Sequence, residues 1–197
     1  MIIAISGLPG SGKSTLAKMV AEKLKLKYFS IGSLMREIAK KNNLSLLELS
    51  AHAEKDKRID AMLDNAQADL AIKEDNYVLD SRLGYHFLKR AFKVFVKVSD
   101  EEAAKRVFEA KRAEEKENTS VDETLKSLQK RHQSEVLRYK KHYGLNPFDE
   151  SNYDYVIDTT GIKQEEAANR LIEKILVWDA NKASAARNIL PAKKRFD

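Results

Sequence analysis

The chain has 197 residues, no cysteine and a formal net charge of +6 at pH 7. This length fits one domain with a sizeable core, and the lack of cysteine excludes disulfides, thiolate zinc sites and thiol chemistry. No signal peptide or membrane-spanning run stands out, so we expect a soluble cytoplasmic protein. The positive charge suits an anionic partner, but composition alone does not distinguish nucleic acid from nucleotides.

The first recognisable pattern is an apolar run at residues 1–5, followed by GLPGSGKST at residues 7–15 and an amphipathic stretch that ends near residue 24. The apolar run has the character of a buried strand, and the amphipathic stretch has the spacing of a helix. A GxxxxGKS loop between a strand and a helix is a phosphate-binding P-loop. The alternative is a glycine-rich turn that only joins two elements, and both flanks argue against it.

This loop supplies the predicted ATP-binding residues. Its glycines let consecutive backbone N–H groups point at phosphate oxygens, and the helix that starts there presents its positive dipole end to the same anion. Lys13 adds a full positive charge and is a candidate catalytic residue, while the Ser14 hydroxyl can bind a Mg²⁺ ion that bridges the β- and γ-phosphates. The predicted set is Gly7, Leu8, Pro9, Gly10, Ser11, Gly12, Lys13, Ser14 and Thr15.

The rest of the chain alternates between strand and helix patterns. Four further short strands are predicted, at residues 27–30, 77–80, 92–98 and 155–158. Helices are predicted from about residue 33, within 42–73, and over 99–112, 120–144 and 164–178, three of them beginning at a capping box such as Ser45 with Glu48. This alternation predicts an α/β fold with a five-stranded parallel sheet that helices cover on both sides.

Polar residues follow two of these strands at the edge where ligands bind in open α/β sheets. Ser30, Gly32 and Arg36 come directly after the second strand, and Asp80 and Arg82 stand at the end of the third. An acid there can orient Mg²⁺ through its water shell, and the arginine can bind a phosphate bidentately. The alternatives without a functional role are that Arg36 is an ordinary surface arginine and that Asp80 and Arg82 form only a local ion pair.

A third charged group lies on one predicted helix. Arg131, Glu135 and Arg138 are four and three residues apart, so they share a face of that helix. Taken alone, this pattern is equally typical of an ordinary salt-bridged helix surface.

Together these blocks resemble the nucleoside monophosphate (NMP) kinases, and more narrowly the cytidylate kinases of the short archaeal type. The resemblance runs from residue 1 to about residue 178. Besides the P-loop, it rests on SIGSLMR at 30–36, LSLLELSAHAEKD at 44–56, VLDSRL at 78–83, RHQSEVLRYKKHYG at 131–144 and YDYVIDTTG at 153–161. The last two blocks are the more discriminating.

The resemblance implies a three-layer P-loop kinase fold in a single domain over residues 1–178. Its core would comprise residues 1–36, 76–110 and 132–178, with a helical NMP-binding insert at about 37–75 and a small lid at about 111–131. Residues 179–197 would form a basic C-terminal extension, with Lys193, Lys194 and Arg195, whose role the resemblance does not explain.

The resemblance also implies roles for the charged residues. Arg36 and Arg82 would hold the acceptor's phosphate, and Arg106, Arg131 and Arg138, which flank the lid, would close over the transferring group as further catalytic residues beside Lys13 of the P-loop. The full NMP-binding set is Ser30, Gly32, Arg36, Asp80, Arg82 and Glu135, of which Glu135 is a candidate for the nucleoside side of the pocket.

Two positions depart from the family's pattern. The family commonly has glycine between the acid of the third strand and its arginine, whereas this chain has Ser81, which narrows the backbone freedom there. The register of the lid arginines is also unsettled, because Ala110 stands one turn after Arg106 and Arg112 follows as a further candidate.

The implied reaction is transfer of the γ-phosphoryl group of ATP·Mg²⁺ to CMP or dCMP. We expect a monomer with nucleotides as its partners, and neither a membrane nor nucleic acid. The open alternatives are the same chemistry on AMP or UMP, and a kinase-like regulatory ATPase that binds RNA through the basic extension. Small-molecule kinases such as those for shikimate lack support from the cytidylate-like blocks.

Overall fold

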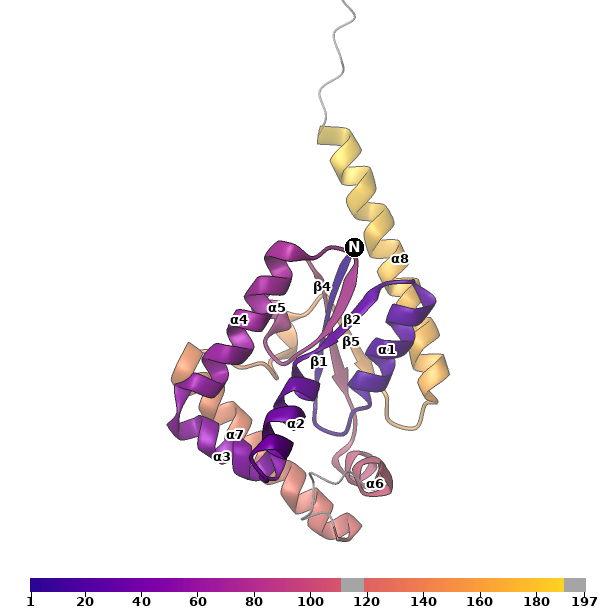
Figure 1. Cartoon of the computed structure of the whole chain (residues 1–197). Coiled ribbons are helices and arrows are strands. Elements are labelled where there is room, and N and C mark those ends of the chain that lie inside the picture. The colour runs from indigo at the N-terminus through magenta and orange to yellow at the C-terminus, as the bar shows by residue number, and fades with distance from the viewer. Residues whose placement is uncertain (111–118, 190–197) are drawn as a thin grey trace, which may run out of the picture.

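The computed structural model describes residues 1–110 and 119–189 (Figure 1). One sheet is built from β1 (Ile2–Gly7), β2 (Lys27–Ser30), β3 (Tyr77–Asp80), β4 (Phe92–Lys97) and β5 (Tyr155–Asp158). The strand order is β2-β3-β1-β4-β5, and every ladder is parallel. The predicted five-stranded parallel sheet and α/β class are confirmed.

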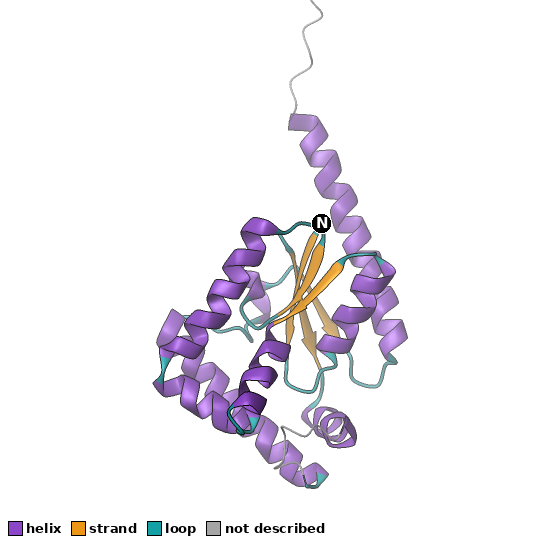
Figure 2. Ribbon diagram, in the orientation of Figure 1, coloured by secondary structure: helices purple, strands orange, loops and turns teal. Residues whose placement is uncertain are grey.

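Helices cover both faces of this sheet, which gives three layers (Figures 1 and 2). One face carries α1 (Lys13–Lys23) and α8 (Gln164–Ile189). The helices α2 (Ile31–Lys41), α3 (Leu46–Lys55), α4 (Lys57–Lys73) and α7 (Val121–Tyr143) lie on the other side, together with the short α5 (Gly84–Phe87). The last helix, α6 (Asp100–Ala110), follows the end of β4.

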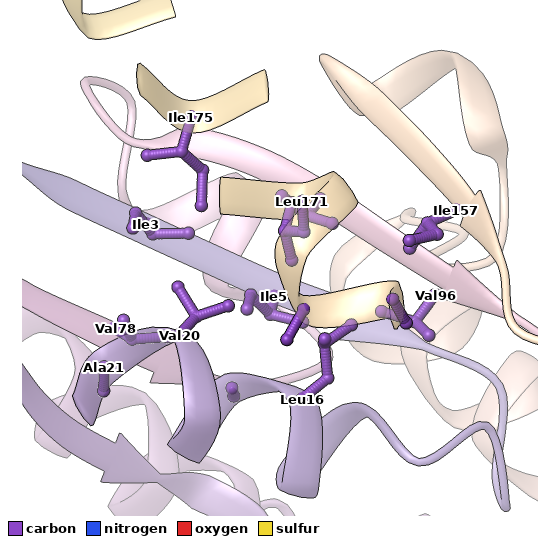
Figure 3. Packing of buried hydrophobic residues seen from close by; sticks show 14 of the residues in the cluster. Ile3, Ile5, Leu16, Val20, Ala21, Val78, Val96, Ile157, Leu171 and Ile175 are labelled. Carbon is purple, nitrogen blue, oxygen red and sulfur yellow. The ribbon is translucent and has the colours of Figure 1, made fainter. Parts of the chain in front are cut away.

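The main hydrophobic core lies between the sheet and the pair α1 and α8 (Figure 3). Ile3 and Ile5 of β1 pack there with Val20 of α1 and with Leu171 and Ile175 of α8, and all five are fully buried. A smaller cluster on the opposite face packs Leu79 and Tyr77 beneath α4. Because parallel strands are covered on both faces, their sequences read as continuous apolar runs.

Helix caps explain several boundaries that the sequence predicted. Ser45 and Glu48 form the complete capping box of α3. Ser120 accepts a hydrogen bond from the Glu123 amide at the start of α7, and Gly144 ends this helix in the left-handed conformation.

Two helix boundaries were predicted wrongly. The second helix begins at Ile31 rather than near residue 33, because Ser30 at the end of β2 is itself the N-cap. The last helix continues to Ile189 rather than ending at 178, since residues 179–189 contain no glycine or proline to stop it. The predicted extension therefore begins inside α8, and Lys193, Lys194 and Arg195 lie outside the described residues.

The sheet separates the two ends of the molecule. The loop after β1 lies at the carboxyl ends of the strands, whereas the end of α8 projects beyond the opposite edge, where the N-terminus lies (Figure 1). Within residues 1–110 and 119–189, none of the helices combines the length and apolar character needed to cross a bilayer.

Candidate active site

A cavity of about 350 Å³ opens at the carboxyl ends of the strands. The P-loop residues 8–15 form part of its wall, and residues 80–83 at the end of β3 and side chains from α2, α3, α4, α6, α7 and α8 form most of the rest. Both the position and the volume are typical of ligand sites in open α/β sheets. The cavity therefore brings the predicted ATP-binding loop and the helical insert to one place.

The P-loop backbone depends on its glycines at two points. Gly10 and Gly12 have φ values of 76° and 77°, in the left-handed region. A Cβ on Gly10 would also lie 2.8 Å from the Cβ of Ala103 in α6. The turn that results leads into the N-terminus of α1, whose first turn contains no acidic residue. This end of the helix is consequently suited to an anion.

Lys13 points from the first turn of α1 to the end of β3. Its Nζ lies 2.9 Å from a carboxylate oxygen of Asp80, which is fully buried. Burial lowers the pKa of Lys13, and nearby Arg82 and Arg131 lower it further, whereas Asp80 opposes the shift. The positive charge of the P-loop is thus balanced by the acid of β3.

Three hydroxyl groups surround Asp80. Tyr28 and Ser30 of β2 each donate to its Oδ2 at 3.2 Å, and Ser14 also hydrogen-bonds to this carboxylate. Burial would raise the pKa of Asp80, but Lys13, the hydrogen bond with Ser14 and nearby Arg82 outweigh it and the pKa is lowered. Asp80 is therefore an ionised acid beside the Ser14 hydroxyl.

These two side chains fit a hard cation such as Mg²⁺, which prefers oxygen ligands and takes few of them from the protein. Over the part of the chain that the structure describes, no group of three or more His, Cys, Asp or Glu side chains could hold a metal ion. Oxygen donors from phosphate and water would have to complete the coordination of an ion held here.

Arg82 and Arg131 meet at one carboxylate. Glu135 accepts from Arg82 Nε at 2.7 Å through one oxygen and from Arg131 Nε at 3.1 Å through the other. Arg82 also donates to the carbonyl oxygen of Gly7 in the P-loop. Burial would raise the pKa of Glu135, but Arg82 and Arg131 outweigh it and bring the pKa to about 2. Glu135 is thus the shared counter-ion of two arginines.

Arg36, on α2 directly after β2, lines the same cavity. Arg36 Nη2 donates to Ser33 Oγ at 3.0 Å, and its guanidinium lies next to Gly32, where a Cβ would be 3.7 Å from Nη1. Ser30 links this segment to Asp80. The predicted acceptor-phosphate residues Arg36 and Arg82 therefore line one wall of the cavity with Asp80.

Arg106 lies at the other side of the P-loop, on α6. It donates to Glu102 at 2.8 Å and to the Thr159 carbonyl at 2.8 Å. The Thr159 hydroxyl in turn donates to the carbonyl of Ser11 in the P-loop. These contacts hold Arg106 beside the phosphate-binding loop. Arg112, the other candidate, falls outside the described residues.

Arg138 is buried farther along α7, beside the insert. Its Nη2 donates to the Tyr139 hydroxyl at 3.0 Å, and its Nε lies 3.7 Å from Asp60 of α4. His142 approaches the same Asp60 oxygen at 3.0 Å. Arg138 therefore faces the insert, whereas Arg131 lies close enough to Lys13 to affect its pKa.

Sequence reasoning missed the polar face that α4 turns toward this cavity. Asp60, Leu63, Asp64 and Gln67 follow helical spacing and all line the cavity. Two buried polar residues at such spacing, on a helix that otherwise reads as a charged surface, are the signal that could have indicated them.

Ser81, the position that departs from the family's glycine, has a structural role. Its hydroxyl donates to Gln67 Oε1 and accepts from the Leu83 amide at 3.2 Å. Both Ser81 and Gln67 are buried. The serine therefore ties the end of β3 to α4.

We expect Ser81→Ala to lower the free energy of unfolding by about 1–3 kcal/mol, because the buried Gln67 carbonyl and the Leu83 amide would each lose a partner. Urea denaturation measures this change. Ser184→Ala, on the exposed part of α8, is the matched control and should change the value by less than about 0.5 kcal/mol. Equal effects of the two substitutions would contradict the assigned role.

Comparisons with known proteins identify the family. The model of the cytidylate kinase-like family matches residues 2–161. A cytidylate kinase from Methanothrix thermoacetophila is 42% identical over 159 residues, which cover 81% of this chain and 88% of that protein. An S-adenosylmethionine-dependent nucleotide dehydratase from Lacinutrix mariniflava is 36% identical, but the chain spans only 35% of its length.

The likeness extends to solved structures. Shikimate kinase from Bacteroides thetaiotaomicron superposes with a TM-score of 0.62, at 19% identity, over 89% of this chain and 98% of that one. At this identity the likeness concerns the fold alone, and it agrees with the predicted P-loop kinase fold.

Proposed function

The chain belongs to the cytidylate kinase-like family, and from this premise we propose that it transfers the γ-phosphoryl group of ATP to CMP or dCMP, giving ADP and CDP or dCDP. Most of the chain matches cytidylate kinases over nearly their whole length. The nucleotide dehydratase suggests no second function, because the chain corresponds to about a third of that protein.

One observation carries this proposal. The P-loop and three arginines from separate elements, Arg36 of α2, Arg82 after β3 and Arg131 of α7, line a single cavity. A P-loop needs only one phosphate chain, so the additional cations favour a second anionic group beside it. Two nucleotides that bind with their phosphates facing each other would supply one anionic group to the P-loop and a second to the arginines.

The proposed mechanism relies on position and charge. Phosphoryl transfer passes through a loose, in-line transition state, so no covalent nucleophile is needed. ATP would lie on residues 7–15, and Arg36 and Arg82 would hold the acceptor phosphate in line with it. Lys13, Arg106 and Arg131 would stabilise the negative charge on the moving group.

Glu135 and Asp80 would act through these cations. Glu135 orients Arg82 and Arg131, and Asp80 keeps Lys13 at the end of β3. We propose that Ser14 and Asp80 would hold Mg²⁺ with ATP, Asp80 through water. When bound, the ion would neutralise charge on the β- and γ-phosphates.

The test is ADP release from ATP·Mg²⁺ with CMP, dCMP, UMP, AMP and GMP in parallel, with an acceptor-free control. We expect CMP or dCMP to give the highest kcat/KM. Activity with AMP or UMP alone would support the proposed phosphoryl transfer but contradict CMP or dCMP as the acceptor. ATP turnover that is indifferent to every acceptor would instead favour a regulatory ATPase.

A further inference from the structure

Two charged side chains lie next to each other in the lining of the cavity, where α7 meets the insert. Asp60 comes from α4 and Arg138 from α7, and both line the cavity. They are among the most buried charged residues that the structure describes, with exposures of 3% and 2%. Charges are rarely buried to this extent unless partners satisfy them.

The hydrogen bonds of Arg138 are incomplete. Its Nη2 donates to the Tyr139 hydroxyl, and its guanidinium stacks 4.8 Å from the centre of that ring. Within the described residues, Nε and Nη1 form no hydrogen bond, and the 3.7 Å between Nε and Asp60 Oδ2 is too long for one. A buried guanidinium with N–H groups to spare, beside a carboxylate, is a site that a ligand would complete.

The position of this pair matches the base rather than the phosphate of a nucleotide. Arg131, close to Lys13, stands seven residues before Arg138, which corresponds to about 10 Å along the helix. That length is similar to the separation between the phosphate of a nucleotide and the far edge of its base. Leu46 and Leu63, from the insert helices, supply apolar surface in the same cavity.

We propose that Asp60 and Arg138 read the base of the acceptor nucleotide, with Asp60 accepting from the 4-amino group of cytosine and Arg138 donating to its N3 and O2. This inference rests on the proposed function and names the groups that select the acceptor. A carboxylate is a suitable partner for the cytosine amino group, and the guanidinium offers only donors. Uracil would place its O4 against the carboxylate and its N3–H against the guanidinium, so both contacts would become repulsive.

The neighbouring polar groups are already engaged. The Tyr143 hydroxyl donates to Asp64 at 2.5 Å, and Gln67 is held by Ser81. Asp64 is also less buried than Asp60, at the next turn of α4. Asp60 also has a partner, since its Oδ2 lies 3.0 Å from His142 Nδ1, but it is the acid of α4 that stands beside the unpaired Nε and Nη1 of Arg138.

The experiment compares kcat/KM for CMP and UMP in the unaltered protein, in Asp60→Asn and in Asp69→Asn. The side-chain amide that Asp60→Asn introduces can donate to O4 of uracil and no longer selects an amino group, so we expect the CMP-to-UMP ratio to fall by about 10-fold or more. Asp69→Asn makes the same chemical change on the exposed face of α4, outside the cavity, and should leave the ratio unaltered. A fall in both activities by one common factor in Asp60→Asn would indicate a purely structural role and overturn the inference.

The outcomes separate this inference from the proposed function. An unaltered protein that does not prefer CMP over UMP would refute the proposed function itself. A clear preference that Asp60→Asn leaves intact would refute only the assignment of Asp60. If Asp60→Asn does not fold, Arg138→Gln supports the same comparison, since the loss of a donor to N3 and O2 should also reduce the ratio.

Discussion

Lys13→Ala is expected to lower turnover with ATP and the preferred acceptor by roughly 10² or more. The substitution removes a full positive charge from the phosphate-binding loop, where the side chain is only 17% exposed. We expect the fold to survive, because Tyr28, Ser30 and Ser14 would still hydrogen-bond to the buried Asp80. Steady-state kcat measures the loss, and circular dichroism with thermal unfolding checks the fold.

Lys18→Ala is the matched control for this prediction. Lys18 lies on the same helix, is exposed and does not line the cavity, although it contacts the ring of Tyr28. We expect its turnover to stay within about a factor of two, since surface substitutions rarely affect a distant site. Near-normal turnover in a folded Lys13→Ala protein would refute the proposed mechanism.

Local patterns were sufficient to predict most of the elements. The strands at residues 27–30, 77–80 and 155–158 were predicted at their observed bounds, since each is a short run rich in aromatic and β-branched residues. The caps at Ser45 and Ser120 were also correct, because a capping box is encoded within four residues. The P-loop could be predicted for the same reason, because its pattern lies within residues 7–15.

The partners of the charged residues could not be predicted in this way. Arg82 and Glu135 are 53 positions apart, and Asp60 and His142 are 82 apart. These contacts depend on how α7 packs against the insert and the end of β3, which no local pattern specifies. The spacing on α7 placed Glu135 on the cavity but could not show that both of its oxygens are taken by arginines.

Glu135→Gln is expected to lower the free energy of unfolding by about 3–5 kcal/mol, the usual range when one partner of a buried ion pair is removed. The side chain of Arg82 is 10% exposed and would keep its charge without its main counter-ion. Equilibrium denaturation at neutral pH measures this loss. Glu123→Gln is the control, because its ion pair with Lys126 on the same helix is exposed and should contribute less than about 1 kcal/mol.

The pH dependence of this loss identifies its cause. The pKa of Glu135 is about 2 in the folded protein, below its ordinary value of 4.5, so the carboxylate contributes its full stability above pH 4.5. That contribution is lost as the pH falls toward 2. The difference between the unaltered protein and Glu135→Gln should therefore be constant from pH 7 to 5 and smaller at pH 3. A difference that stays the same at pH 3 would instead show that the shape of the glutamate side chain, rather than its charge, stabilises the fold.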